Sequence, residues 1–140
     1  MSDSAFFDTN VLVYAHVLNE PRKQKVAEQL YRRHAAGKNI SLSTQVLQEF
    51  FVTLTKKVAG VSLEEALALT EDLAKLHVVT IQPVDILEAI GVQKRYRISF
   101  WDGLILTSAI KAQAGVLYTE DLSHGQIFGG LRVENPFLLH

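Results

Sequence analysis

The chain has 140 residues, 48% hydrophobic and 21% charged, which is enough to build one soluble domain over residues 1–140 without disulfides or a structural metal. Cysteine is absent, which excludes disulfides, thiolate zinc sites and cysteine nucleophiles and fits the reducing cytoplasm, where we expect the protein to act. The net charge is −1, which does not indicate a strongly basic nucleic-acid binder. No apolar stretch approaches the roughly 20 residues of a membrane span, so the sequence does not indicate a membrane protein.

Short apolar runs alternate along the chain with helical patterns. In chain order we expect a strand over 5–7, a helix from about residue 10, a helix over 22–36, a strand over 40–42, a helix from 43 or 44 to about 58, a helix from 62 to about 76, a strand over 78–81, a helix from 85 to about 96, a helix over 100–114, and strands over 116–119 and 131–133.

Several helix boundaries are marked by residues that cap free backbone groups. Ser62 and Glu65 have the spacing of a capping box, in which each side chain bonds the other residue's amide. Asp85 and Ser99 are expected to cap the two helices that follow, since side chains of both types accept bonds from free amides. Gly115 is a typical end for the second of them.

Strands that alternate with helices predict a parallel sheet, because parallel strands are joined by right-handed helical crossovers. We therefore expect an α/β fold, a three-layer α/β/α sandwich around a parallel sheet of about five strands. Ligands of such folds bind beyond the carboxyl ends of the strands. Asp8 and Asp121 each follow a predicted strand, so the topology places both carboxylates where chemistry normally occurs.

Two aspartates lie in strongly apolar segments. Asp8 follows the strand over 5–7 and is either an N-cap of the next helix or a functional carboxylate at the sheet edge. Asp102 belongs to a segment that is apolar nearly all round, which predicts a buried helix. A buried carboxylate must be paired, hydrogen-bonded or bound to metal, so a structural salt bridge is the alternative to a functional role for Asp102.

Asp121 and Glu49 carry weaker signals. Asp121 follows the strand over 116–119 and is either a site residue or a loop residue in an Asx turn. The neighbouring Glu120 is the weaker candidate because it should point the other way. Glu49 falls nearly opposite the apolar stripe of its helix, so periodicity alone predicts an exposed surface glutamate.

Together these four acids predict a site made of carboxylates without histidine or cysteine ligands. Hard oxygen donors of this kind select Mg²⁺ or Mn²⁺ over zinc. In protein sites such ions act on phosphate esters, where they polarise the phosphoryl oxygen and lower the pKa of bound water. Chemistry on a phosphate ester is therefore the function that the residues favour.

Four segments of the chain together resemble a known family. They are residues 7–12, 48–50, 99–105 and 118–125. In order and spacing they resemble the motifs of PIN-domain ribonucleases, and in particular the toxins of VapBC-type toxin–antitoxin modules. The resemblance implies a single PIN-like α/β/α domain, Mg²⁺- or Mn²⁺-dependent cleavage of RNA, a homodimer and a cognate antitoxin protein as partner.

The resemblance also implies roles for individual residues. Asp8 and Asp102 are similar to the central metal ligands of the family, and Glu49 and Asp121 complete the acidic cluster. The supporting polar positions of the site are taken by Thr9, Asn10 and Thr119, to which we add the capping Ser99.

The sequence departs from the family pattern in two places. Gly103 stands where alanine is common, and Ser123 and His124 stand where some members have a further acid. The second departure leaves open whether the site holds one metal ion or two.

A small basic cluster precedes the segment that contains Asp102. Lys94, Arg95 and Arg97 are candidate contacts for RNA phosphates, and a solvated helix face is the alternative explanation of three adjacent charges. His124 is a further candidate contact with RNA, or a residue that only shapes its turn.

Two other functions are consistent with parts of the pattern. A catalytically inactive PIN-like module would use the same fold to bind RNA or a partner protein. A haloacid-dehalogenase-type phosphatase also has an aspartate after its first strand, but its chemistry resembles Asp-x-Asp, and position 10 here is asparagine. Metal-dependent RNA cleavage by the toxin of a type II toxin–antitoxin pair is the favoured prediction.

Overall fold

A six-stranded sheet runs through the computed structural model, which describes residues 4–17 and 20–138. The strands are β1 (Ala5–Phe7), β2 (Ile40–Ser43), β3 (His77–Val79), β4 (Val116–Tyr118), β5 (Ile127–Phe128) and β6 (Leu131–Glu134). Their order across the sheet is β3-β2-β1-β4-β6-β5, and only β5 is antiparallel to its neighbour. The predicted α/β fold with a mostly parallel sheet is confirmed, with β5 as a sixth strand that is too short for a periodic signal.

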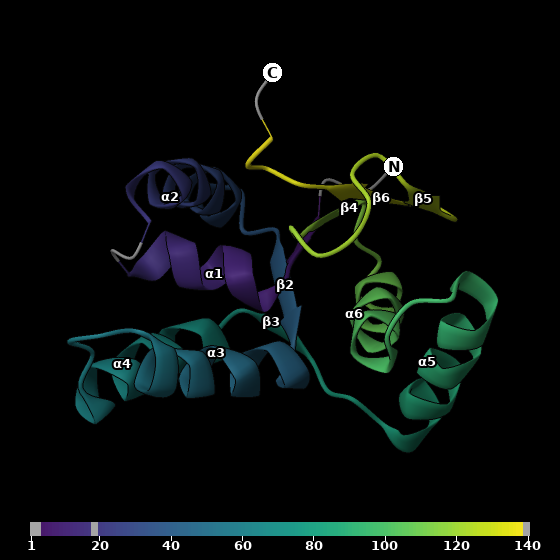
Figure 1. The fold of residues 1–140 in the computed structure, drawn as a ribbon, viewed down its shortest axis with the longest axis horizontal. Helices are drawn as coiled ribbons and strands as arrows, with labels where there is room; N and C mark the ends of the chain where they lie inside the picture. The colour runs from purple at the N-terminus through teal and green to yellow at the C-terminus, as the bar shows by residue number, and fades with distance from the viewer. Residues whose placement is uncertain (1–3, 18–19, 139–140) are drawn as a thin grey trace.

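Within the described residues, six helices flank the sheet. They are α1 (Thr9–His16), α2 (Pro21–Ala36), α3 (Thr44–Lys57), α4 (Leu63–Ala74), α5 (Pro83–Tyr96) and α6 (Phe100–Lys111). Figure 1 shows α1 and α2 to one side of β1 and β2, and α5 and α6 to the other. In the part of the chain that the structure describes, no helix is both long and apolar enough to cross a bilayer.

Three of the four inner strands are buried along their whole length. Every residue of β1, β2 and β4 is buried, which is the pattern of strands covered on both faces. β1 lies between β2 and β4, where Ala5 pairs with Ile40 on one side and with Val116 on the other. The apolar side chains of these strands therefore form the centre of the core and hold the ends of β1 and β4 side by side.

The helix caps agree with the sequence at Ser62 and Ser99, but the prediction for Asp85 was wrong. The N-cap of α5 is Gln82, and the helix begins at Pro83, whose fixed φ suits a first helical position. Asp85 lies three residues after the cap, where its carboxylate accepts a bond from the Gln82 amide at 2.7 Å. The same carboxylate accepts from Lys111 Nζ at 2.7 Å, and this contact chiefly lowers its pKa.

Helix α6 is less buried than the sequence predicts, because it is not covered all round. Residues 103–109 are buried, whereas Trp101 is 61% exposed and Ile110 is 51% exposed. The helix packs against α5 and against β2, so those faces are covered while side chains near its two ends reach solvent. Gly103 permits the close approach to α5, because a Cβ there would lie 2.8 Å from the carbonyl oxygen of Ala89.

We predict that Gly103→Ala destabilises the protein by about 1–3 kcal/mol, since the new methyl group meets backbone that cannot move aside easily. Gly91→Ala in α5 is the matched control, because a Cβ at Gly91 meets nothing within 4 Å. That change should stabilise the protein by up to about 1 kcal/mol through helix propensity alone. Urea unfolding of both variants measures the free energies, and equal effects would contradict the close helix contact.

Candidate active site

The candidate site lies at the carboxyl end of the sheet, between β1 and β4. The chain extends from β1 to one side through β2 and β3, while β4 pairs with β1 on its other side, so this is the point where the strand order reverses. Phe7 pairs with Tyr118, and the amide of Asp8 then bonds the Tyr118 carbonyl at 3.0 Å. Asp8 and Thr119 are therefore brought to the same place by the pairing of the two strands.

Asp8 is the most buried carboxylate of the site, with 5% of its surface exposed. It is also the N-cap of α1, so the capping explanation of its sequence position is confirmed, while its functional role stays a prediction. Its Oδ1 accepts from the Thr9 amide at 2.7 Å, and its Oδ2 accepts from the Thr119 hydroxyl at 2.8 Å. Burial chiefly, together with the charges of Asp121 and Glu49, raises its pKa to about 7, although the two bonds act to lower it.

Three polar side chains connect the other acids to Asp8. The Thr9 hydroxyl donates to Glu49 Oε1 at 2.9 Å, so this glutamate is half-buried beside α1 rather than exposed as periodicity predicted. The Asn10 amide donates to Asp121 Oδ2 at 3.0 Å. The Thr119 hydroxyl also accepts from the Asp121 amide at 3.1 Å, which joins the two aspartates through one side chain.

Asp102 approaches the cluster from α6. Ser99 caps this helix by accepting from the Asp102 amide at 3.0 Å, as predicted. Asp102 is half-buried rather than deeply buried, and among the described residues its carboxylate accepts no hydrogen bond. Burial is the main cause that raises the pKa of Asp121, and the charge of Asp102 is the next. The two carboxylates are therefore close enough to repel each other.

Glu120 is drawn into a separate contact that the sequence did not reveal. Its carboxylate accepts from the Tyr14 hydroxyl at 3.0 Å and from Lys23 Nζ at 2.7 Å. The Lys23 ammonium also lies over the rings of Tyr14 and Phe137. No local sequence signal could have found this group, because its members come from distant parts of the chain. A positive charge thus balances the fifth acid beside the cluster.

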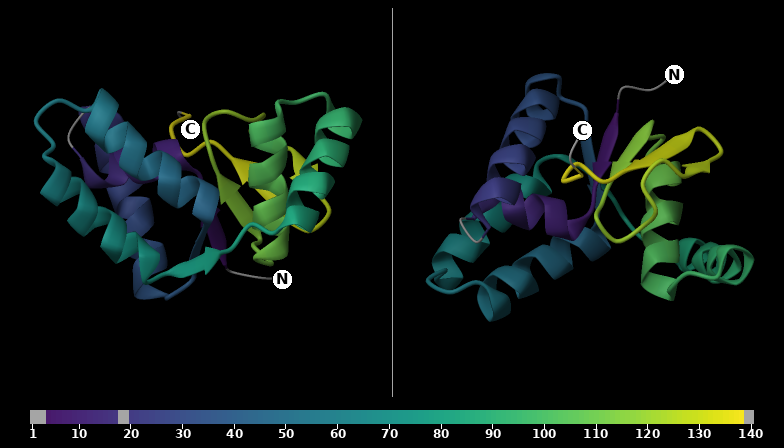
Figure 2. Two further views of the ribbon diagram at one scale, coloured as in Figure 1. Left: turned by 90° about the horizontal axis from the view of Figure 1, so that it is seen from below. Right: turned by 45° about the horizontal axis from the view of Figure 1, so that its top comes forward.

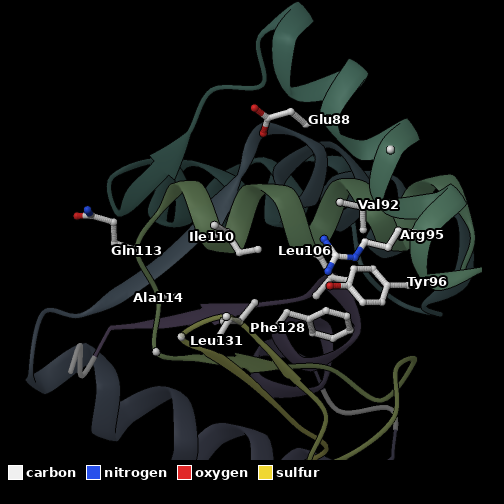
Figure 3. A pocket seen from close by; sticks show the side chains of 14 residues that line it. Glu88, Val92, Arg95, Tyr96, Leu106, Ile110, Gln113, Ala114, Phe128 and Leu131 are labelled. Carbon is white, nitrogen blue, oxygen red and sulfur yellow. The ribbon is translucent and has the colours of Figure 1, made fainter.

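A groove of about 660 Å³ opens between α1 and α3 at this edge. Among the residues that line it are four acids and two polar residues, namely Asp8, Thr9, Asn10, Glu49, Glu120 and Asp121. A larger hollow of about 700 Å³ lies between α5, α6 and the β5–β6 hairpin, and its lining is mostly apolar (Figure 3). None of the four candidate acids lines that hollow. Asp8, Glu49 and Asp121 line the smaller groove, whereas Asp102 lines neither of the two.

The basic candidates lie at the end of α5. Lys94, Arg95 and Arg97 are exposed, and none forms an ion pair with an acid in the described ranges. Arg95 lies over the ring of Tyr96, and Figure 3 shows both at the larger hollow. His124 accepts from the Asn135 amide at 3.0 Å through Nδ1, which favours a role in its loop. Contact of these residues with RNA stays a prediction.

The donor set suits a hard divalent cation, although a finished ligand cage is not formed. No group of three or more Asp, Glu, His or Cys side chains within residues 4–17 and 20–138 is arranged to hold a metal ion. The charges of neighbouring acids nevertheless help to raise the pKa of Asp8 and of Asp121, an effect that a cation would reverse. The Asn10 Oδ1 atom is buried beside them without a hydrogen-bond partner. Oxygen donors alone are the ligands that Mg²⁺ and Mn²⁺ prefer.

Solved structures with the same fold include several toxin–antitoxin proteins. The chain is similar to a toxin–antitoxin complex from Klebsiella pneumoniae, with 20% identity, a TM-score of 0.71, and 95% of this chain and 98% of that chain covered. It is similar to VapC20 from Mycobacterium tuberculosis, titled a sarcin-ricin loop cleaving toxin, with 19% identity, a TM-score of 0.64, and 81% and 87% covered. It is also similar to VapBC2 from Rickettsia felis bound to a DNA fragment from their promoter, with 20% identity, a TM-score of 0.66, and 94% and 97% covered.

The sequence itself matches a family profile over most of its length. No curated protein sequence matches the chain. The profile of the PIN domain, however, matches residues 5–127, which include all four candidate acids. This match and the mostly parallel sheet agree with the resemblance carried by the sequence motifs. The chain therefore belongs to the PIN domain family.

Proposed function

We propose that this protein is a metal-dependent ribonuclease that hydrolyses RNA phosphodiester bonds with Asp8, Glu49, Asp102 and Asp121. The observation that carries the proposal is the network of hydrogen bonds that gathers Asp8, Glu49 and Asp121 at the carboxyl edge of the sheet. The charge of Asp102, from the start of α6, also acts on Asp121. Burial is the main cause that raises the pKa of Asp8 to about 7, and the charges of the neighbouring acids also raise it. Such an arrangement is costly without a cation and is typical of a functional site.

The four carboxylates would hold Mg²⁺ or Mn²⁺. Bound there, the ion supplies positive charge for the phosphoryl oxygens and makes water a stronger nucleophile. The chain's own part is to fix the carboxylates. Thr9 bonds the carboxylates of both Asp8 and Glu49, and Asn10 bonds that of Asp121. Thr119 bonds the carboxylate of Asp8 and the backbone amide of Asp121. Such outer partners of metal ligands orient them and limit the positions that an ion can take.

Related structures support a biological role for this activity. VapC20 is described as a toxin that cleaves the sarcin-ricin loop, and other similar structures are toxin–antitoxin complexes. We propose by analogy that this protein is the toxin of a type II pair, acts on RNA in the cytoplasm as a homodimer, and binds a cognate antitoxin protein.

The first prediction concerns the carboxylates themselves. Asp8→Asn and Asp102→Asn should each lower the rate of RNA cleavage by more than about 100-fold, the upper range for residues that only support metal ligands. Glu71→Gln, which removes an exposed acid of α4, should leave the rate unchanged. Cleavage of labelled RNA with Mg²⁺ or Mn²⁺ measures this, and EDTA should abolish it. Wild-type rates in either aspartate variant would exclude the assignment.

The second prediction concerns Thr119, which bonds both Asp8 and Asp121. Thr119→Val keeps the shape but removes the hydroxyl, so both partners lose a bond. Cleavage should fall roughly 10- to 100-fold, as for other partners of metal ligands, with weaker Mn²⁺ binding in calorimetry. Thr119→Ser restores the hydroxyl and should restore most of the affinity and rate. Equal behaviour of the two variants would mean that the hydroxyl has no role in positioning.

The third prediction follows from the raised pKa of Asp8. Its value of about 7 in the folded protein lies above its ordinary value of 3.8, so the proton favours folding. This stabilisation is full below about pH 4 and is lost as the pH rises through 7. In EDTA, the free energy of unfolding of the wild type should fall by a few kcal/mol relative to Asp8→Asn between these limits.

Urea unfolding at several pH values measures that difference. Because the asparagine that replaces Asp8 in the variant does not titrate, the contributions of other groups largely cancel in the comparison. Mn²⁺ should reverse the loss for the wild type, since a ligand that binds only the folded state stabilises it. A difference that stays constant from pH 4 to pH 8 would contradict the raised pKa of Asp8.

A further inference from the structure

Trp101, at the start of α6, is exposed to solvent. It is the only tryptophan of the chain, and 61% of its surface is exposed. Its ring meets the ring of Phe100 edge to face, with centroids 5.1 Å apart, so one neighbour supports it. Tryptophan is mostly buried in folded proteins because its ring is large and apolar. An exposed ring directly beside a site residue, Asp102, therefore offers area to a ligand.

Two unpaired basic residues lie close along the chain from this ring. Lys94 and Arg97 are exposed and form no ion pair in the described part of the protein. A turn of three residues, 97–99, separates α5 from α6, so the end of α5 lies beside the start of α6. The contact of Lys111 with Asp85 joins the other two ends, so the helices are antiparallel.

This turn lies at the edge of the sheet that carries the acids. The left view of Figure 2 shows it at the same edge as the loop after β4. The repulsion between the charges of Asp102 and Asp121 also indicates that the start of α6 lies near the loop after β4, because charges act strongly only at short range. An extended ligand in the acidic groove could therefore continue over the start of α6 to the end of α5.

We propose that Trp101 is a platform on which an unpaired nucleobase of the RNA stacks, while Lys94 and Arg97 bind phosphates of the same strand. Stacking on exposed aromatic rings, with basic residues along the backbone, is how proteins bind single-stranded nucleic acid. With a net charge of −1, the chain must attract phosphate locally rather than through its overall field. The inference rests on the proposed function and adds that the substrate is single-stranded near the cleaved bond.

A second copy of the chain is a less suitable occupant for this surface. A two-fold contact centred on Trp101 would gather Lys94 and Arg97 of both copies into one interface. Like charges opposed across an interface repel, whereas an RNA strand brings phosphates to them. A base within a duplex is already stacked and cannot use the ring, so the occupant is an unpaired nucleotide.

The single tryptophan allows a direct test. Fluorescence of the Asp8→Asn protein, which should not cut its ligand, is followed while a ten-nucleotide single-stranded RNA of mixed sequence is added. Stacking on Trp101 should quench the emission and protect it from acrylamide. An abasic strand of equal length and charge, and a duplex of the same sequence, should quench much less. Equal quenching by the abasic strand would overturn base stacking.

Variants of Trp101, with a control elsewhere on α6, separate the contribution of the indole ring to RNA affinity from that of the surrounding surface. In the same background, Trp101→Ala should raise the dissociation constant for labelled RNA roughly 5- to 150-fold, the range for one base on an aromatic ring. Trp101→Phe keeps an aromatic face and should recover part of the affinity. Ile110→Ala removes an exposed apolar side chain from the opposite end of α6 and should have no effect. An unchanged affinity in Trp101→Ala would exclude the platform.

The charges are tested through salt. Lys94→Gln and Arg97→Gln should each reduce the slope of log affinity against log salt by about 0.7, the value for one phosphate of a single strand. Lys38→Gln, in the loop before β2, removes an equal charge and should not change the slope. Equal slopes in all three variants would remove Lys94 and Arg97 from the contact.

Two further readouts separate this inference from the function on which it rests. If the wild type cleaves RNA while Trp101→Ala cleaves at the same kcat/KM, the function stands and the platform is wrong. If no RNA is cleaved but the ring is quenched only by strands with bases, the binding surface stands without the nuclease. The Trp101 emission could instead shift with protein concentration alone, as the chain forms a dimer through Trp101. That result would assign the surface to a second copy and overturn the proposal.

Discussion

The parallel pairing of β1 with β4 is the contact on which the candidate site depends. It places Asp8 beside Thr119, two residues that are 111 positions apart in sequence, at one edge of the sheet. Because these strands are buried throughout, their register is specified by the core and cannot slip without exposing apolar side chains. The position of the carboxylates thus follows from the same packing that stabilises the fold.

Burial of a carboxylate at this edge works against stability. Asp8 gives up water for two hydrogen bonds, and its neighbours in the cluster are acids. A buried cluster of acids of this kind lowers the free energy of unfolding, a trade-off that is common at functional sites. The bonds from Thr9 and Thr119 limit the cost, because they satisfy one oxygen each.

Charge is separated along the same edge rather than averaged over the surface. The acids line the groove between α1 and α3, whereas basic residues without acidic partners lie at the end of α5. The exposed ring of Trp101 and the carboxylate of Asp102 occupy adjacent positions at the start of α6, the helix that follows α5. Overall composition hides this arrangement, since the charges nearly cancel. Only the positions of the charges separate an acidic groove from a basic helix end.

The sequence by itself determined the α/β class, nearly all the elements and the likeness to PIN domains, because apolar periodicity and capping are local properties. It also singled out Asp8, whose apolar surroundings are visible in one segment. Only the tertiary structure decided that Glu49 is half-buried through Thr9, that Trp101 is exposed, and that Lys23 balances Glu120. These depend on which helices pack together, and long-range contacts of that kind leave no mark on the period of a single helix.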